Sequence, residues 1–127
     1  MAKISILQAP TFQRVVEIPR IGGDPVKVSF DFKFLDRDQL AEFMDAEFTF
    51  SKEFGAATQE EGTTLKSLTG KTEEFQIEQL QKIVAGWGFD EPFDADNLRA
   101  LVRTAGTVPD AILTAYKQSY QAAREGN

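Results

Sequence analysis

The sequence predicts an α+β fold, in which an N-terminal antiparallel β-hairpin is followed by about four α-helices. One stretch near the N-terminus alternates strictly between apolar and polar residues, which is typical of a strand with one buried face. Several later segments repeat their apolar residues every three or four positions, which is typical of helices. With 127 residues, 42% hydrophobic and 27% charged, the chain has the size and composition of one globular domain. We therefore expect 1–127 to form a single domain.

The hairpin is predicted from two runs and the turn residues between them. In 26–34, valines and phenylalanines alternate with polar residues, and 12–18 is rich in β-branched residues. The residues 19–25 contain the Gly and Pro of a hairpin loop. We expect antiparallel strands at 12–18 and 26–34, with 3–7 as a candidate third strand. Because an isolated hairpin is only marginally stable, its phenylalanine face needs a cover of helices or a partner.

The first helix is predicted over 36–54. Asp36 is a suitable N-cap, and Gln39 stands where it can complete a capping box. The helix is expected to end near Gly55. Its apolar positions recur at helical spacing: Leu40, Phe43, Met44 and Phe48.

The segment 55–71 is predicted to be a mobile loop, because it is polar and rich in Gly and Thr. Loops of this length are uncommon in compact domains and tend to be functional or disordered.

Three further helices are predicted within 72–125. Thr72 is expected to cap the first of them, which ends near Gly86, and Asp94 to cap the second. Pro109 lies at the start of the third, where its missing N–H costs nothing. The packing face of this last helix is predicted to hold Ile112, Tyr116, Ser119, Tyr120 and Ala123.

Composition excludes several classes of chemistry. Fourteen Lys and Arg against 20 Asp and Glu give a net charge of −6, which repels phosphate backbones and anionic lipids, so we expect neither nucleic acid nor membrane as a partner. The chain has no Cys and no His, which removes disulfides, thiolate nucleophiles and the commonest general base. The N-terminus shows no long apolar run, so no signal peptide or membrane anchor is expected, and the cytoplasm is the expected location.

Two segments match parts of chemical sites, and both fail the full pattern. The sequence Gly70-Lys71-Thr72 matches the end of a phosphate-binding loop, but Leu65 stands where that motif needs Gly, and the polar run 59–64 stands where it needs a strand. A loop that ends in an N-cap Thr is the preferred interpretation. The acidic cluster in 90–96 fails the calcium-loop pattern at Leu98 and lacks its Gly. We therefore expect no catalytic site, no metal and no cofactor, and a protein that is not an enzyme.

Five aromatic residues in the second half are candidates for a partner-binding surface, since aromatic residues are enriched at interface hot spots. They are Trp87, Phe89, Phe93, Tyr116 and Tyr120. Core packing is the competing interpretation and is preferred for Trp87 and Phe93. For the tyrosines both interpretations stay open, because a phenol can keep its hydroxyl in water at the edge of a groove.

Short motifs follow one another in a defined order along the chain. A helix that ends in Trp lies at 86–90, and a Phe-Asp helix start follows at 93–94. A helix that opens with Pro at 109–112 carries an Ala-Tyr pair at 115–116, and 123–127 ends in Gly-Asn. The hairpin segment 16–26 and the Phe-Lys-Phe of 32–34 precede them. In this combined order the chain resembles the phage tail assembly chaperones of long-tailed phages and prophages. Only 51–71 has no counterpart in the resemblance.

The resemblance implies a protein that binds the tape measure protein, the long helical polypeptide that sets tail length, and keeps it soluble until tail-tube subunits polymerise around it. It implies a siphophage or prophage origin, absence from the mature virion, and in many members a longer frameshifted form. The tail tube protein and a second copy of the chain are further candidate partners. The alternative is a structural minor tail or head–tail junction protein that stays in the virion. A nucleotide-dependent enzyme acting through Gly70-Lys71-Thr72 is a third possibility.

The last helix is the expected client-binding face. Ala111, Ala115 and Ala122 would let a client helix approach closely, while Tyr116 and Tyr120 would anchor it. The face is expected to extend to 126–127. The full set of candidate partner-binding residues is Ala111, Ile112, Ala115, Tyr116, Tyr120, Trp87, Phe89 and Phe93.

Overall fold

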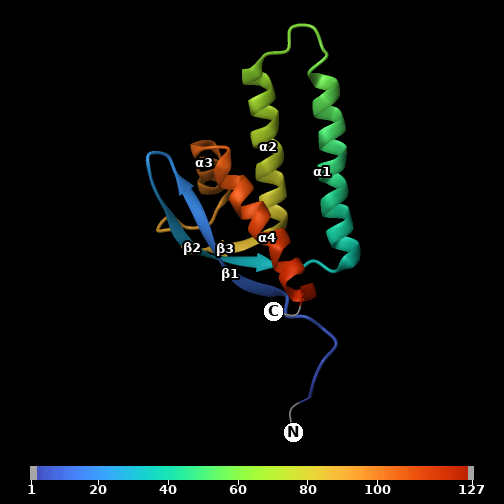
Figure 1. Ribbon diagram of the computed structural model, residues 1–127, viewed down its shortest axis with the longest axis vertical. Helices are drawn as coiled ribbons and strands as arrows, with labels where there is room; N and C mark the ends of the chain where they lie inside the picture. Colours follow the sequence, from blue (N-terminus) through green and yellow to red (C-terminus); the bar gives the residue numbers. More distant parts are fainter. Residues whose placement is uncertain (1–2, 126–127) are drawn as a thin grey trace.

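The computed structural model describes residues 3–125 and confirms an α+β arrangement (Figure 1). A three-stranded antiparallel sheet is combined with four helices. The elements in chain order are β1 (Thr11–Arg20), β2 (Gly23–Lys33), α1 (Arg37–Ala57), α2 (Leu65–Ile83), β3 (Val84–Trp87), α3 (Ala95–Thr104) and α4 (Thr107–Glu125).

The strands β1 and β2 form the predicted hairpin, with Thr11 opposite Lys33 and Ile18 opposite Val26. Both strands are longer than expected, and the turn is much tighter than the predicted loop 19–25. Gly22 supplies the turn, with a φ of 75° that glycine adopts without strain. The register shifts between Ile18 and Arg20, so the Pro residues beside the turn lie at an irregularity of the ladder and do not open a long loop.

The third strand is β3, which pairs antiparallel with β2 and places Trp87 opposite Phe30. The prediction of a third strand at 3–7 is therefore wrong, because that segment is irregular and exposed. The predicted helix end near Gly86 is also wrong, since α2 stops at Ile83. Gly88 lets the chain approach β2 closely: its N–H donates to the Ser29 carbonyl at 2.8 Å, and a Cβ on it would lie 3.4 Å from that oxygen.

The capping box of α1 is confirmed. The Asp36 side chain accepts from the Gln39 N–H at 2.9 Å, and the Gln39 side chain accepts from the Asp36 N–H at 3.0 Å. The helix continues past the predicted end to Ala57, so Gly55 lies in its last turn.

The start of α2 corrects the predicted loop 55–71. Thr64 and Ser67 form a capping box in which the Thr64 side chain accepts from the Ser67 N–H at 3.1 Å. The connection between α1 and α2 therefore covers only 58–64, and its mobility stays a prediction. Thr72, predicted to be an N-cap, lies inside the helix, where its hydroxyl donates to the Leu68 carbonyl at 3.0 Å.

The last two helices agree with their predicted starts. The Asp94 side chain caps α3 by accepting from the Asn97 N–H at 2.8 Å. Pro109 lies in the first turn of α4 and is fully buried.

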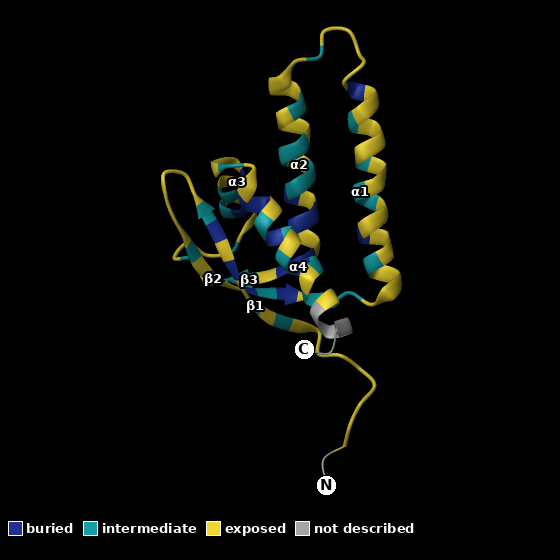
Figure 2. Cartoon of the chain, viewed as in Figure 1, coloured by how far each residue is buried: buried dark blue, intermediate teal, exposed yellow. Residues whose placement is uncertain are grey.

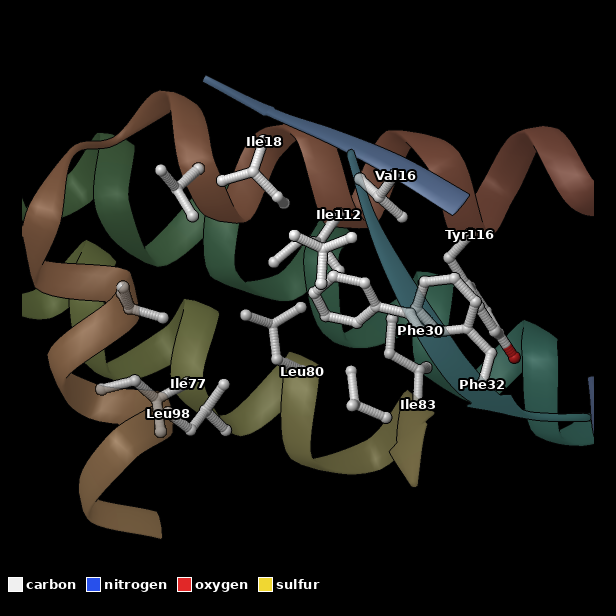
Figure 3. Packing of buried hydrophobic residues seen from close by; sticks show 14 of the residues in the cluster. Val16, Ile18, Phe30, Phe32, Ile77, Leu80, Ile83, Leu98, Ile112 and Tyr116 are labelled. Carbon is white, nitrogen blue, oxygen red and sulfur yellow. The ribbon is translucent and has the colours of Figure 1, made fainter. Parts of the chain in front are cut away.

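The core lies between one face of the sheet and the helices α2, α3 and α4 (Figure 3). On the hairpin, Val16, Ile18, Val28, Phe30 and Phe32 point inward, and the alternate side chains on the opposite face are mostly exposed. The alternation of apolar and polar residues therefore gives the hairpin one buried and one solvent-exposed face, as predicted.

The helices α1 and α2 run side by side as an antiparallel pair, and the loop between them lies far from the sheet (Figure 1). Toward that loop the pair is mostly exposed, and burial is concentrated near the sheet (Figure 2). We call the residues 41–78, which include the outer parts of both helices, the outer arm. Within 3–125, no helix has the length and apolar character needed to span a membrane.

Candidate functional site

The segments that partly match chemical motifs do not form chemical sites. Gly70-Lys71-Thr72 lies inside α2, so it is neither a phosphate-binding loop nor the loop with an N-cap Thr that we preferred. Within 3–125, no three Asp or Glu side chains are grouped so that they could hold a metal ion. The predicted partner-binding residues and the surface grooves are the remaining candidates for a functional site.

Two of the predicted binding residues on α4 belong to the core. Ile112 and Tyr116 are fully buried and cannot touch a partner in this fold, which corrects their proposed role. The Tyr116 hydroxyl donates to the Lys33 carbonyl at 2.9 Å, at the end of β2. Burial raises the pKa of this phenol, and the hydrogen bond with Tyr120 raises it further, so Tyr116 stays neutral and acts as a donor.

Tyr120 is partly buried and connects α4 to the segment between β2 and α1. Its hydroxyl accepts from the Leu35 N–H at 2.9 Å and lies 3.1 Å from the Leu35 carbonyl. The Tyr116 hydroxyl is 3.0 Å away, and the Phe34 ring is stacked on the Tyr120 ring at 6.2 Å. These contacts favour the interpretation of Tyr120 as a packing residue over that of a client anchor.

Trp87, Phe89 and Phe93 form a partly buried cluster beside β3. The Trp87 ring makes edge-on contacts with Phe89 at 5.1 Å and with Phe93 at 5.0 Å, and its indole N–H donates to the Glu91 carbonyl at 2.8 Å. Trp87 and Phe89 also line a groove of about 460 Å³ between the hairpin tip and α3. All three rings pack against the core cluster, so core packing accounts for most of their surface.

Ala111 and Ala115 lie in a second groove of about 460 Å³, between α4 and β1. The β1 side of this groove is lined by 14–17, and Thr107 and Thr114 contribute from α4. The expectation that small residues on α4 leave room for a close approach therefore holds for these two alanines. The predicted extension of this face through the Ala122 side chain to 126–127 lies outside the described residues.

A third groove, which was not predicted from the sequence, lies on the outer arm and has a volume of about 710 Å³. Phe50 of α1 stacks face to face on Phe75 of α2 with 4.2 Å between ring centroids, and Phe54 lies 5.9 Å from Phe50. All three rings are only partly buried. Ala46 and Gly70 line the same groove and leave space between the helices.

A second apolar stripe on α1 is exposed. Met44 is 44% and Phe48 60% exposed, although both belong to the regularly spaced apolar positions of the predicted helix. Lys52 lies over the Phe48 ring, with its Nζ 4.4 Å from the centroid. The signal was present in the sequence, since Leu40, Met44 and Phe48 repeat every four residues on one side of the helix.

The segment from α1 to α2, with the loop between them, carries most of the net charge. Between 37 and 83 the sequence has ten Asp or Glu and five Lys or Arg, and the excess lies in α1 and in the loop. The exposed apolar side chains of α1 thus lie on an acidic helix, a combination that keeps a protein soluble while it offers an apolar contact.

A comparison with protein families matches the whole chain, residues 1–127, to the family described as phage tail assembly chaperone. No curated protein and no solved structure gives a significant match. The chain belongs to the phage tail assembly chaperone family.

Proposed function

We propose that this protein binds the tape measure protein and keeps it soluble in the host cytoplasm during tail assembly, without chemistry of its own. One observation carries the proposal beyond family membership: the outer arm exposes Met44 and Phe48 on one side of α1, and a groove lined by phenylalanines lies on another side of the same helix. A client with amphipathic helices needs an apolar surface of this kind to cover its apolar face.

The shape and charge of the outer arm fit a helical client. A client helix that lies along the exposed side of α1 would cover Met44 and Phe48. The groove with Phe50, Phe54 and Phe75 lies on a different side of α1 and offers a second apolar contact. The acidic excess of α1 and of the loop 58–64 favours a client helix with basic residues beside its apolar stripe. It also raises the association rate at low salt, because opposite charges steer the encounter.

Co-expression tests this proposal. The tape measure protein is produced with the wild-type chain or with a double variant, Met44→Ser/Phe48→Ser, and its soluble fraction is measured. Both positions are exposed, so the variant should keep its unfolding free energy within about 0.5 kcal/mol, or gain stability. If Met44 and Phe48 form an interface hot spot, the double variant should weaken client binding by about 2 kcal/mol or more, which is roughly 30-fold in Kd.

The matched control is Ile21→Ser, which removes an exposed apolar side chain from the hairpin tip. It should leave client solubility at the wild-type level. A double variant that is folded and solubilises its client as well as the wild type would exclude the Met44 and Phe48 side of α1 as the binding site. If the wild-type chain itself fails to solubilise the tape measure protein, the proposed function is wrong.

A further inference from the structure

The outer edge of β1 is free. The sheet order β1-β2-β3 leaves β1 with one neighbour. The Phe34 N–H donates to the Pro10 carbonyl at 2.8 Å, so these two residues form a hydrogen-bonded pair. In antiparallel strands, hydrogen-bonded and non-hydrogen-bonded residue pairs alternate, and this bond therefore shows which residues of β1 point toward β2. Even-numbered residues of β1 therefore bond to β2. The N–H and C=O groups of Gln13, Val15 and Glu17 point outward, and no other backbone hydrogen bond of the described residues uses them.

The groove between α4 and β1 runs along this free edge. It is lined by Val15, Val16 and Glu17 on the strand and by Ala111 and Ala115 on the helix. A strand added to the edge would bond to the outward groups, and every second side chain would point into the groove. Open strand edges beside such a groove are used in protein recognition, where main-chain bonds give affinity and the groove selects side chains.

The N-terminal segment of the same chain has the chemistry for this site. Ile4 and Ile6 are each 97% exposed and Leu7 is 80% exposed, on a segment that leaves the sheet and touches little else (Figure 1). Their alternation in Lys3-Ile4-Ser5-Ile6 would place both isoleucines on one face of a strand. Three large, adjacent apolar side chains in water mark a segment that gains stability by docking.

The chain cannot easily dock this segment on its own β1. Pro10 already belongs to the ladder, so a hairpin would have to turn at Gln8 and Ala9. Two-residue hairpin turns need positive φ, which Gly, Asn and Asp supply and which these two residues do not favour. The local bond from the Leu7 N–H to the Ser5 hydroxyl, at 3.0 Å, is exposed and can be exchanged for ladder bonds at little cost.

We infer that the segment 3–7 of one copy adds as a strand to the β1 edge of a second copy, with Ile4 and Ile6 in the groove over Ala111 and Ala115. This goes beyond client binding, since it uses the edge of β1 and the groove against α4 and involves neither Met44 nor Phe48. A reciprocal exchange gives a closed dimer, and a one-way exchange gives a chain of copies.

Two variants separate the two halves of the contact. Ile4→Ser/Ile6→Ser removes the docking side chains from an exposed segment and leaves the edge intact. Val15→Pro removes an outward N–H from an exposed position, so it spares the bonds between β1 and β2 while blocking the added strand. Val15→Thr is its matched control.

Sedimentation equilibrium measures the mass of each protein up to about 1 mM, a range that covers weak interfaces. The wild type and Val15→Thr should associate as concentration rises, while each test variant should stay monomeric or weaken by tenfold or more in Kd. An equal mixture of the two test variants should form heterodimers, because one supplies the segment and the other the edge. The chain has no Cys, so Ile6→Cys mixed with Ala115→Cys should give a single crosslinked dimer under oxidation.

A wild type that stays monomeric over this range would overturn the inference, as would a mixture that fails to associate. If Val15→Pro does not fold, hydrogen exchange on the wild type replaces it: protection of the Gln13, Val15 and Glu17 amides should rise with protein concentration. Protection that is independent of concentration in a monomer would show docking within one chain and overturn the inference. Client solubilisation by Ile4→Ser/Ile6→Ser should match the wild type, so this test and that of the proposed function fail separately.

Discussion

At the scale of single residues, Phe30 is the centre of the core. It is fully buried and its ring contacts Phe32, Trp87 and Phe89 at centroid distances of 5.7, 6.3 and 6.0 Å. Phe30→Ala should therefore lower the free energy of unfolding by about 3–5 kcal/mol, as measured by urea denaturation. Lys27→Ala, on the wet face of the same strand, should change it by less than about 0.5 kcal/mol. A loss near zero for Phe30→Ala would place the phenylalanine face on the surface.

Tyr120 gives a second test at this scale, because its ring and its hydroxyl make separate contributions. Tyr120→Phe keeps the ring against Phe34 but leaves the Leu35 N–H without its acceptor, so a loss of about 1 kcal/mol is expected in thermal denaturation. Tyr120→Ala loses both, and about 2–4 kcal/mol is expected. A stable Tyr120→Ala variant that binds its client poorly would restore the role of Tyr120 as a client anchor.

At the scale of elements, α2 and α3 are joined by an ion pair in which both Arg99 N–H groups reach the Glu74 carboxylate. The hydrogen bond from Arg99 lowers the pKa of Glu74, so the unfolded chain binds this proton more readily than the folded one. The stabilisation is thus fully present above the ordinary Glu pKa and is lost as the pH falls through the lowered value. Because both side chains are exposed, the effect should be small.

The measurement is the urea midpoint between pH 7 and pH 3 for the wild type and Glu74→Gln. The variant should be slightly less stable at neutral pH, and the difference should shrink as the pH falls below the ordinary Glu pKa. Glu78→Gln, an exposed change on the same helix, is the control and should show no such convergence. A difference between Glu74→Gln and wild type that stays constant down to pH 3 would show that the ion pair does not form in solution.

At the scale of the whole molecule, the fold divides into a packed body and an outer arm. The body holds most of the core, to which Phe43 and Ile77 of the arm contribute, while the arm adds exposed apolar surface and negative charge. This division suits a protein that covers a client temporarily, since removal of the client leaves the core untouched. A permanent structural subunit would instead be expected to bury such surface in the finished particle.

The protein inventory of mature virions separates these two roles. We expect this chain to be absent from purified particles by mass spectrometry, while it is abundant in the infected or induced cell. The major tail tube protein in the same sample is the positive control. Detection of the chain at a fixed ratio to tail subunits would favour the structural minor tail or head–tail junction protein.

The sequence by itself determined the elements whose signals are local. The strict alternation of β2 fixed its period and its dry face, and the caps at Asp36 and Asp94 fixed the starts of α1 and α3. Pro109 likewise marked the first turn of α4. These signals act within a few residues of one another, so they hold whatever the rest of the chain does.

Only the tertiary structure decided the features that depend on distant partners. β3 becomes a strand because β2 offers its edge, although its four residues follow a helix directly. The segment 65–71 is helical beside α1 despite its Gly and Thr content, because packing in a helix pair can outweigh weak propensity. The apolar spacing of α1 and α4 could not show that Tyr116 is buried while Phe48 is exposed, since exposure depends on which helix face meets the sheet. The sequence therefore contained the apolar stripe of the candidate binding site but could not show that it is exposed, because such a stripe has the same spacing whether a core or water lies against it.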